Sequence, residues 1–425
     1  MKIGYISLGC PKNEIDLEYI LGCFDDRFSI VHDPAEADCI IINTCAFIEP
    51  ARQESIEQIL YVTQYKKNNP ALKVIVTGCM PQRYKDALQR EIPEVDKYFC
   101  SNDIAETRRH IMDYFQTRPV PPARGRITAS HFACLKIADG CDNRCSYCAI
   151  PLIKGPYKSR PFSEILDEAE ALTANGVKEL ILVAQDTTRY GADFNYKKTL
   201  ADVLIALNDI KGLEWIRLMY THPAHWNDRL IETMAGLDKV VRYIDLPIQH
   251  ISDTILEKMG RKVTRKQITA LVEKLRMNIP GVALRTSIIT GFPGETVKEF
   301  RELLQYLAEV RFERLGVFTY SHEEDTRAFS LADNVSAKVK KQRQEKIMDQ
   351  QAEISAANNE KLIGQIMDVI IDEEYPDNNL SFGRTRQDAP EIDNSVIVKP
   401  AVPVGDIRSV KIIAANEYEL YADLI

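Results

Sequence analysis

The sequence predicts an α/β protein of three parts: an N-terminal parallel α/β domain, a central partial (β/α)6 TIM-like barrel and a small C-terminal antiparallel β-barrel. Three observations predict this order. Short apolar runs alternate with helical stretches in the first part, six strand-like runs recur in the second, and short β-type runs separated by turns fill the third. The 425 residues, 45% of them hydrophobic, suffice for a core in each part.

Residues 1–116 are the predicted N-terminal domain. The runs KIGYISLGC, CIIINTCAF and KVIVTGCM have the composition of strands, and the stretches EIDLEYILGCF, ARQESIEQILYVTQYKK and PQRYKDALQREI that of helices. This alternation indicates a parallel sheet with crossover helices. Residues 117–129, rich in proline and arginine at their start, are predicted to be a stiff, exposed linker.

Residues 130–358 are the predicted barrel domain with a trailing helix. Its strand-like runs are LKIADGC, ELILVAQDT, WIRLMYTHP, YIDLPIQH, ALRTSIITGF and RLGVFTYSH. Functional groups of such a barrel lie at the C-terminal ends of its strands. The charged stretch at 336–362 lacks Gly and Pro and predicts a long surface helix, and 359–425 are predicted to form the small β-barrel.

Composition limits the function. The N-terminus lacks a basic segment followed by an apolar one, and no apolar run reaches the roughly 18 residues of a bilayer span. We therefore expect a cytoplasmic protein without membrane contact, in which ten cysteines favour metal binding over disulfides. The net charge of −8 gives no support for a broadly basic, nucleic-acid-binding surface.

The segment DGCDNRCSYCAIP places Cys141, Cys145 and Cys148 in CxxxCxxC spacing directly after a predicted strand. Three thiolates so close can hold three irons of a four-iron cluster and leave one iron open. An open iron can chelate S-adenosylmethionine and pass it an electron, which yields a 5′-deoxyadenosyl radical, so no side-chain acid or base is expected to be catalytic. Structural zinc is the alternative, but zinc usually takes four ligands in paired spacing and no second pair is present.

A second set, Cys10, Cys45 and Cys79, follows the three predicted N-terminal strands, each cysteine just before a helix. In a parallel sheet those strand ends meet at one edge, where helix N-termini favour an anionic ligand. A lone cysteine at a strand end is more often inert packing. Three in equivalent places favour a shared metal site.

These residues carry a family resemblance. The CxxxCxxC motif, with Tyr147 before its last cysteine, resembles that of the radical S-adenosylmethionine superfamily, and the two cysteine patterns in this order resemble the methylthiotransferase family over essentially the whole chain. The resemblance implies a C-terminal TRAM barrel, two 4Fe-4S clusters and S-adenosylmethionine. It also implies that the first cluster holds or delivers sulfur methylated by one S-adenosylmethionine, while the second makes the radical from another.

The superfamily resemblance also implies that the glycine-bearing stretch TGFPGET lies against the cofactor, although a βα turn with a helix cap explains it equally well. Other residues end barrel strands and are, on position alone, as readily structural as functional. The expected cofactor-binding residues are Tyr147, Gln185, Arg217, Gln249, Gly291 and Glu295. Asp186 and His250 have similar places, and His222 and His225 are expected to line the pocket at most.

The family has one branch that modifies a transfer RNA nucleoside and one that modifies the β-carbon of an aspartate in the basic ribosomal protein S-twelve. Residues 361–425 contain six Lys or Arg against twelve Asp or Glu, a balance of −6. Such a tail repels phosphate and attracts a basic protein, and the stretches SLGCPKNEID, YIDLPIQHIS and RTRQDAPEIDNS are similar to the protein-modifying branch. Ribosomal protein S-twelve is thus the expected partner and transfer RNA the alternative, with reduced flavodoxin or a ferredoxin-type protein as electron donor.

Two hypotheses come from other classes of protein. A non-catalytic iron–sulfur carrier needs both cysteine sets but leaves the glycine-bearing strand ends unexplained. A plain TRAM-type RNA-binding module calls for a basic face, which the acidic tail does not supply.

Overall fold

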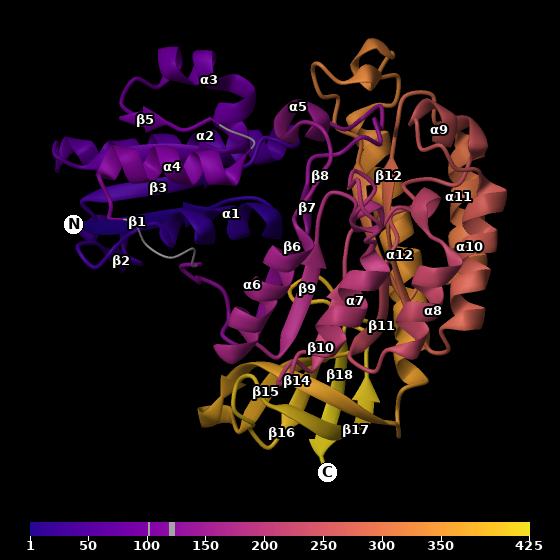
Figure 1. Ribbon diagram of the computed structural model, residues 1–425. Coiled ribbons are helices and arrows are strands. Elements are labelled where there is room, and N and C mark those ends of the chain that lie inside the picture. The colour runs from indigo at the N-terminus through magenta and orange to yellow at the C-terminus, as the bar shows by residue number, and fades with distance from the viewer. Residues whose placement is uncertain (101–102, 119–123) are drawn as a thin grey trace. The chain divides into compact units, whose positions relative to one another are not determined.

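The computed structural model describes residues 1–100, 103–118 and 124–425. These fall into two compact units (Figure 1): Met1–Thr128 with Gly140–Asp142 and Cys148–Tyr157, and Ala129–Asp139 with Asn143–Tyr147 and Lys158–Ile425. The predicted central and C-terminal domains both lie in the second unit, and their boundary stays a prediction. Residues 119–123 of the predicted linker lie outside the described residues.

The first unit is built on a parallel sheet in the order β2-β1-β3-β4-β5. Its strands are β1 (Lys2–Ser7), β2 (Ser29–Val31), β3 (Cys39–Thr44), β4 (Lys73–Gly78) and β5 (Lys97–Tyr98). The three predicted strands are adjacent in the centre of the sheet. The two edge strands were not predicted, because runs of two and three residues show no periodicity.

Helices cover both faces of this sheet, as successive strand residues point to opposite sides. The helices are α1 (Pro11–Leu21), α2 (Glu49–Gln64), α3 (Cys79–Glu91) and α4 (Ile104–Phe115). Ile41 shares a core with Leu17 of α1 and Ile111 of α4, whereas its neighbour Ile42 shares a core with Ile59 of α2. The sheet is therefore the middle layer of three.

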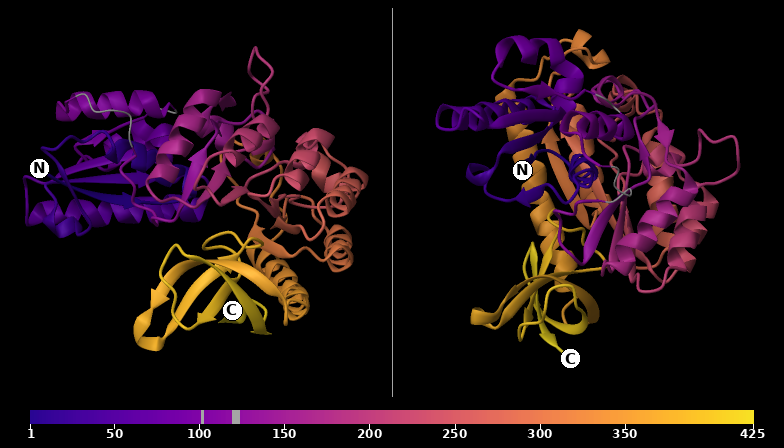
Figure 2. Two further views of the ribbon diagram at one scale, coloured as in Figure 1. Left: turned by 60° about the horizontal axis from the view of Figure 1, so that its bottom comes forward. Right: turned by 60° about the vertical axis from the view of Figure 1, so that its left-hand side comes forward.

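The second unit contains the six predicted barrel strands as one parallel, open sheet in the order β13-β12-β11-β10-β9-β6. The segments that carry these strands run from magenta to orange in Figure 2. The strands are β6 (Phe132–Lys136), β9 (Glu179–Val183), β10 (Trp215–Leu218), β11 (Val240–Asp245), β12 (Ala283–Thr290) and β13 (Arg314–Thr319). The short strands β7 (Ala138–Asp139) and β8 (Lys158–Ser159) pair separately. The partial (β/α)6 barrel is thereby confirmed.

Helices follow these strands in the predicted alternation. They are α6 (Phe162–Ala174), α7 (Leu200–Asn208), α8 (Asp228–Gly236), α9 (Asp253–Lys258), α10 (Arg265–Asn278), α11 (Val297–Val310) and α12 (Ala337–Glu360). The last is the predicted long helix. Among the residues that the structure describes, no helix is both long and apolar enough to cross a membrane.

The C-terminal residues form a closed barrel in the order β14-β15-β16-β18-β17. Its strands are β14 (Ile366–Tyr375), β15 (Leu380–Thr385), β16 (Ser395–Lys399), β17 (Ile407–Ala415) and β18 (Glu419–Leu424). The predicted small β-barrel is confirmed, with the refinement that β16 and β18 pair in parallel. Closure leaves this sheet without a free edge.

A buried ion cluster joins this barrel to the open sheet. Glu179, the first residue of β9, is fully buried and accepts a hydrogen bond from Nε of Arg217 at 2.8 Å. Arg384 of β15 forms an ion pair with its other oxygen. Burial alone would raise the pKa of Glu179, but Arg384 and Arg217 lower it below its usual value. The stability that this shift contributes is present above the ordinary carboxyl pKa and is lost as the pH falls through the lowered one.

We expect Glu179→Gln to lower the free energy of unfolding by about 3–5 kcal/mol, because it leaves buried guanidinium groups without their counter-charge. Urea denaturation followed by circular dichroism measures this. The control is Glu302→Gln, whose partner Arg265 lies at 2.9 Å in a partly exposed pair and which should cost less than about 1 kcal/mol. Equal losses in the two variants would contradict the assignment.

Candidate functional site

Cys10, Cys45 and Cys79 lie where the sequence predicts them. Cys10 immediately precedes α1, Cys45 directly follows β3, and Cys79 is the first residue of α3 after β4. The strands β1, β3 and β4 are neighbours in register, so these turns occupy one edge of the sheet. Gly9 has a φ of +94°, and a Cβ added there would lie 2.8 Å from Cβ and 3.0 Å from Sγ of Cys45. The turn before Cys10 therefore packs directly on Cys45.

Asn13 ties the three turns together, a role that the sequence did not predict. Its amide nitrogen donates to the carbonyl oxygens of Leu8 at 3.2 Å and Thr44 at 2.9 Å. Its Oδ1 accepts from Sγ of Cys79 at 3.5 Å. Its own carbonyl accepts from Asn43 at 2.5 Å. Both asparagines are almost fully buried, which for an amide requires such partners.

The thiols of this set suit a soft metal. Burial raises the pKa of Cys79 to about 12, against the opposing charge of Lys154, and burial also raises the pKa of Cys45. Without metal these two thiols are therefore neutral, and iron binding has to displace their protons. Three sulfur ligands at a sheet edge, with helix N-termini alongside, fit an iron–sulfur cluster.

A helix after the CxxxCxxC motif packs beside this site. The helix α5 (Ile150–Lys154) begins two residues after Cys148, and Ile153 shares a hydrophobic core with Cys79. Nζ of Lys154 lies 2.9 Å from a carboxylate oxygen of Asp16, with both side chains about nine-tenths buried. The ion pair fixes α5 on α1.

The central part of the motif, Asn143–Tyr147, belongs to the second unit. Ser146 anchors it: its N–H donates to Met259 O at 2.8 Å and its hydroxyl to Lys258 O at 2.7 Å. Nη1 of Arg261 lies 3.7 Å from Sγ of Cys145. Burial would lower the pKa of Arg261, but Tyr147 and Cys145 raise it overall, so a permanent cation lies beside this thiol. The sequence did not predict Arg261, which ends no strand.

Tyr147 and Gln185 lie near this segment. Tyr147 packs against a core of Met259, Phe292 and Tyr320. Gln185 follows β9, and its amide donates to Asp139 at 2.9 Å. Gln185 thus lies just after the C-terminal end of a barrel strand, as the sequence predicted, and Tyr147 lies within the cysteine motif.

Asp186 joins three segments at the same end of the sheet. Its carboxylate accepts hydrogen bonds from Asn143 at 2.7 Å and from Thr188 at 2.5 Å, and it lies 2.7 Å from Nδ1 of His225. Burial would raise the pKa of Asp186, but His225 and His222 lower it overall. This carboxylate thus connects the cysteine motif with the turn after β10.

His222 and His225 lie closer together than their loop context suggested. Their rings stack with centroids 4.9 Å apart, and with Asp186 they offer ligand atoms within 4.8 Å of one another. Burial lowers the pKa of His222 to about 2, and the nearby charge of Arg261 lowers it further. The positive charge of Arg261 disfavours a metal ion at this place. We therefore interpret Asp186, His222 and His225 as a hydrogen-bonded wall, without a metal.

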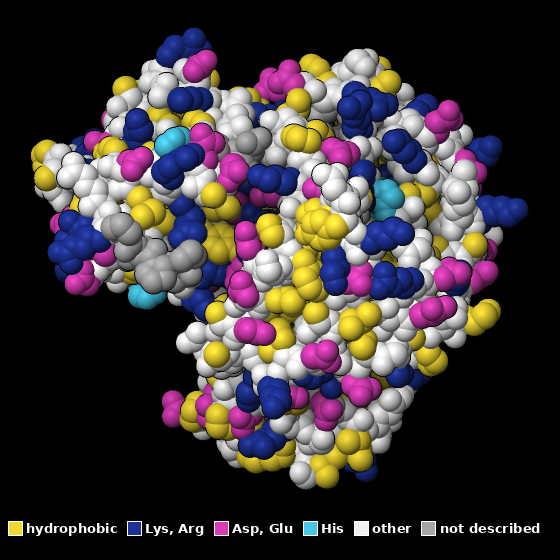
Figure 3. Space-filling view, in the orientation of Figure 1, with side chains coloured by type: hydrophobic (Ala, Val, Ile, Leu, Met, Phe, Trp, Pro, Cys, Tyr) yellow, Lys and Arg dark blue, Asp and Glu magenta, His cyan; other side chains and the backbone are white. Residues whose placement is uncertain are grey.

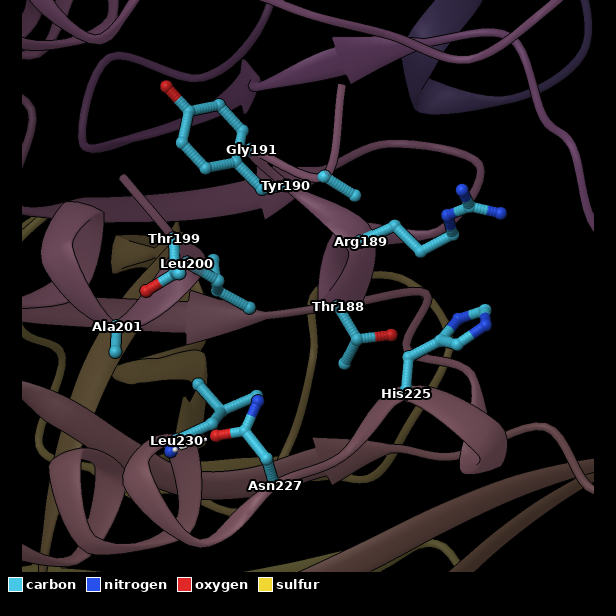
Figure 4. A pocket seen from close by; sticks show the side chains of 11 residues that line it. Thr188, Arg189, Tyr190, Gly191, Thr199, Leu200, Ala201, His225, Asn227 and Leu230 are labelled. Carbon is cyan, nitrogen blue, oxygen red and sulfur yellow. Dashed lines mark hydrogen bonds between the residues drawn. The ribbon is translucent and has the colours of Figure 1, made fainter. Parts of the chain in front are cut away.

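A pocket of about 500 Å³ opens beside this wall (Figure 4). Thr188, Arg189 and His225 lie on one side of it and Leu200 and Ala201 on the other. The lining comes from the segments after β9 and β10 and from the start of α7. It is therefore a cavity at the functional end of the open barrel.

Gln249 and His250 follow β11. Gln249 has a φ of +68°, a conformation that is strained for a residue with a side chain. Hydrogen bonds of 2.9 Å to Ser287 O and from Ile289 N hold it against β12. His250 is fully buried, and burial lowers its pKa to about 3.

Two expected cofactor ligands have other partners. Glu295 accepts hydrogen bonds at 2.7 Å from the Gly291 N–H and from Arg343 of α12. Gly291 has a φ of +72°, and a Cβ there would meet the side chain of Lys340 at 2.2 Å. The stretch TGFPGET is thus attached to α12, which agrees with the alternative interpretation of this stretch as a structural turn. Arg217 lies in the ion cluster at the opposite ends of the strands, where it also donates to Arg386 O at 3.0 Å.

Comparison with known proteins adds independent findings. Residues 135–307 match the Radical SAM superfamily, residues 2–100 the Uncharacterized protein family UPF0004 and residues 363–425 the TRAM domain. The chain is 43% identical to "Ribosomal protein uS12 methylthiotransferase RimO" of Lachnoclostridium phytofermentans, over 99% of both chains. It is 44% identical to the protein of that name from Desulforamulus reducens, again over 99% of both.

Solved structures agree on the fold. The tryptophan-bound radical S-adenosylmethionine methyltransferase TsrM of Kitasatospora setae has a TM-score of 0.54 at 15% identity, with 74% of this chain and 72% of that chain covered. The cobalamin-dependent radical enzyme OxsB has a TM-score of 0.51 at 12% identity, over 83% and 56%. At such identities the likeness concerns architecture alone.

The fold, the two cysteine sets and the matching domains define a radical S-adenosylmethionine enzyme with an additional N-terminal domain and a TRAM barrel. S-adenosylmethionine and two 4Fe-4S clusters are the cofactors of this class. The chain belongs to the RimO family of ribosomal protein uS12 methylthiotransferases. The family prediction is thereby confirmed.

The packing of Gly9 on Cys45 gives a test of the N-terminal site. We expect Gly9→Ala to lose about half of the iron of the reconstituted enzyme, because its Cβ displaces Cys45 from a four-iron site. Gly176→Ala is the matched control: its φ of +93° imposes similar backbone strain, but nothing lies within 4 Å of the added Cβ. Iron analysis and Mössbauer spectroscopy measure the outcome, and full iron content in Gly9→Ala would refute it.

Proposed function

We propose that the enzyme catalyses methylthiolation of the β-carbon of an aspartate in ribosomal protein uS12, with one S-adenosylmethionine as methyl donor and another as radical source. The observation that carries this proposal is the 43–44% identity to RimO proteins over 99% of the chain. Both cysteine sets, on which the chemistry depends, lie within the matched regions. The alternative reaction, methylthiolation of a transfer RNA adenosine, is not favoured.

Cys141, Cys145 and Cys148 are the proposed ligands of the radical-forming cluster, which when bound supplies the electron that cleaves S-adenosylmethionine. Arg261 places a cation 3.7 Å from Sγ of Cys145, beside this proposed ligand. Tyr147, Gln185, Gln249 and Gly291 are the proposed boundary of the cofactor pocket. Arg217 and Glu295, predicted for the same role, have charged partners inside the protein, which favours a structural role for both.

Cys10, Cys45 and Cys79 are the proposed ligands of the auxiliary, sulfur-supplying cluster. The buried amides of Asn13 and Asn43 hold the turns that bear these cysteines. Such partners around metal ligands keep the ligand geometry fixed.

Charge supports a basic protein substrate. Arg384, Asp388 and Asp393 of residues 361–425 have buried side chains in ion pairs. The remaining five Lys or Arg and ten Asp or Glu still give the barrel an acidic balance of −5. On the face shown in Figure 3, acidic and basic side chains are interspersed. The acidic barrel favours encounter with a basic partner over a polyphosphate. The proposed ribosomal substrate supports a cytoplasmic location. We propose reduced flavodoxin or a ferredoxin-type protein as the electron donor.

The reaction is tested by mass spectrometry after anaerobic incubation of the reconstituted enzyme with S-adenosylmethionine, a reductant, and either uS12 or transfer RNA. We expect a methylthio increment on an aspartate of uS12 and none on transfer RNA. An increment on a transfer RNA adenosine would overturn the substrate assignment.

The two cysteine sets should fail in different ways. Cys145→Ala should abolish formation of 5′-deoxyadenosine, since the cluster that reduces the cofactor is lost. Cys79→Ala should retain that cleavage but form no methylthiolated product. Cys134→Ala, which changes a half-buried cysteine outside both sets, is the control and should retain both activities. Product formation by Cys79→Ala would exclude the auxiliary role.

A further inference from the structure

The turn at residues 386–394 of the C-terminal barrel covers the N-terminal ends of the open sheet. Nη1 of Arg386 donates to Asp238 O at 2.8 Å, just before β11, and Gln387 donates to Gly281 O at 3.4 Å, just before β12. Asp388 accepts from Nε of Arg314, the first residue of β13, at 2.8 Å. The turn thus holds three successive strands at their beginnings.

One side chain of this turn reaches between the strands. Asp393 is buried, and its Oδ2 accepts hydrogen bonds from Tyr243 Oη at 2.7 Å and from Ala389 N at 2.9 Å. Its Oδ1 lies 3.4 Å from Nε of Arg285 in β12. Burial raises the pKa of Asp393, and the charge of Arg285 opposes that rise. A carboxylate of the barrel is therefore paired inside the sheet.

Arg285 extends the contact toward the other end of the strands. Its Nη1 lies 3.1 Å from Oδ1 of Asp245, the last residue of β11. Burial would lower the pKa of Arg285, but Asp245, Tyr243 and Asp393 raise it above its usual value. The guanidinium is thus a permanent cation held between two carboxylates, one from each domain.

Asp245 in turn fixes the segment after β10. Its Oδ2 accepts from Tyr220 N at 3.0 Å, and its carbonyl accepts from Thr221 N at 3.1 Å and from the Thr221 hydroxyl at 2.5 Å. Tyr220 has a φ of +57°, a conformation that persists only where the surroundings enforce it. The next residue but one, His222, donates its N–H to Thr188 at 3.1 Å.

We infer that Asp393, Arg285 and Asp245 form a buried positioning chain through which the TRAM barrel fixes the turn at 220–225. That turn carries His225, which lines the pocket and contacts Asp186, and Asp186 holds Asn143 of the cysteine motif. These three residues touch neither cofactor nor substrate in this scheme. They set the shape of the pocket on the side of His225, so that the Asp393–Arg285 contact of the barrel and the geometry of the pocket depend on each other.

The test compares two neutralised carboxylates of the same turn in the full-length, reconstituted enzyme. Asp393→Asn removes the charge that holds Arg285, and amide hydrogen exchange at 220–222 should rise about tenfold or more. Asp388→Asn breaks the neighbouring pair with Arg314, which is not part of the chain of contacts to residues 220–225. This variant should leave amide exchange at 220–222 unchanged. Exchange measured by mass spectrometry on peptides covering 216–226 distinguishes them.

Exchange that rises equally in both variants, or in neither, would overturn the inference. Because Asp393→Asn can also weaken folding, Arg285→Lys is the second variant: it keeps the charge but loses the fork that spans both carboxylates, and it should raise the same exchange with little change in melting temperature. If amide exchange at 220–222 does not rise in Arg285→Lys, that result contradicts the proposed positioning chain.

A functional readout depends on the proposed function. In Asp393→Asn the KM for uS12 should rise and the methylthio product per 5′-deoxyadenosine should fall, with the Asp388→Asn values close to those of the parent enzyme. If the parent enzyme does not modify uS12, the proposed substrate fails while the exchange experiment still decides the positioning chain. If amide exchange at 220–222 becomes faster in Asp393→Asn but the methylthio product per 5′-deoxyadenosine is unchanged, the positioning chain has a structural role only. That outcome would refute its effect on the pocket.

Discussion

Parallel strands deliver the residues that follow them to a single edge, and the chemistry of this chain depends on that constraint. In the first unit it brings the turns of Cys10, Cys45 and Cys79 to one edge of a five-stranded sheet. In the second it gathers Gln185, Asp186 and the turn after β10 at the ends of the barrel strands. Neither group is local in sequence, so each depends on the pairing register of its sheet.

The same constraint explains what the sequence could predict. Strand-end cysteines stand out because a short apolar run, a cysteine and a helical stretch repeat in order. Asn13 and Arg261 gave no comparable signal. Asn13 is defined by the Thr44 carbonyl and the Cys79 thiol in the other two turns, and Arg261 by a sulfur more than a hundred residues away in the chain. Contacts of this kind follow from tertiary structure and have no periodicity to detect.

The strand-end rule also selected residues that serve the structure. Arg217 lies within an otherwise apolar strand, and a buried guanidinium there required a buried carboxylate, which Glu179 supplies. Glu295 was chosen for its turn, yet its two partners fasten that turn to α12. Charged residues of this kind attach one element to another, so a place at a strand end did not by itself distinguish a cofactor ligand from a structural residue.

Buried ion pairs are a costly way to attach a barrel to a sheet, because desolvation offsets most of their attraction and apolar contacts of equal size stabilise as well. What they add is a defined orientation. An apolar interface tolerates small rotations, whereas Glu179 with Arg384, Asp388 with Arg314 and Asp393 with Arg285 are each satisfied in one register only. We interpret the charges as the means by which the barrel is held at a fixed angle to the strands, so that the acidic barrel and the pocket, at opposite ends of one sheet, keep a constant separation.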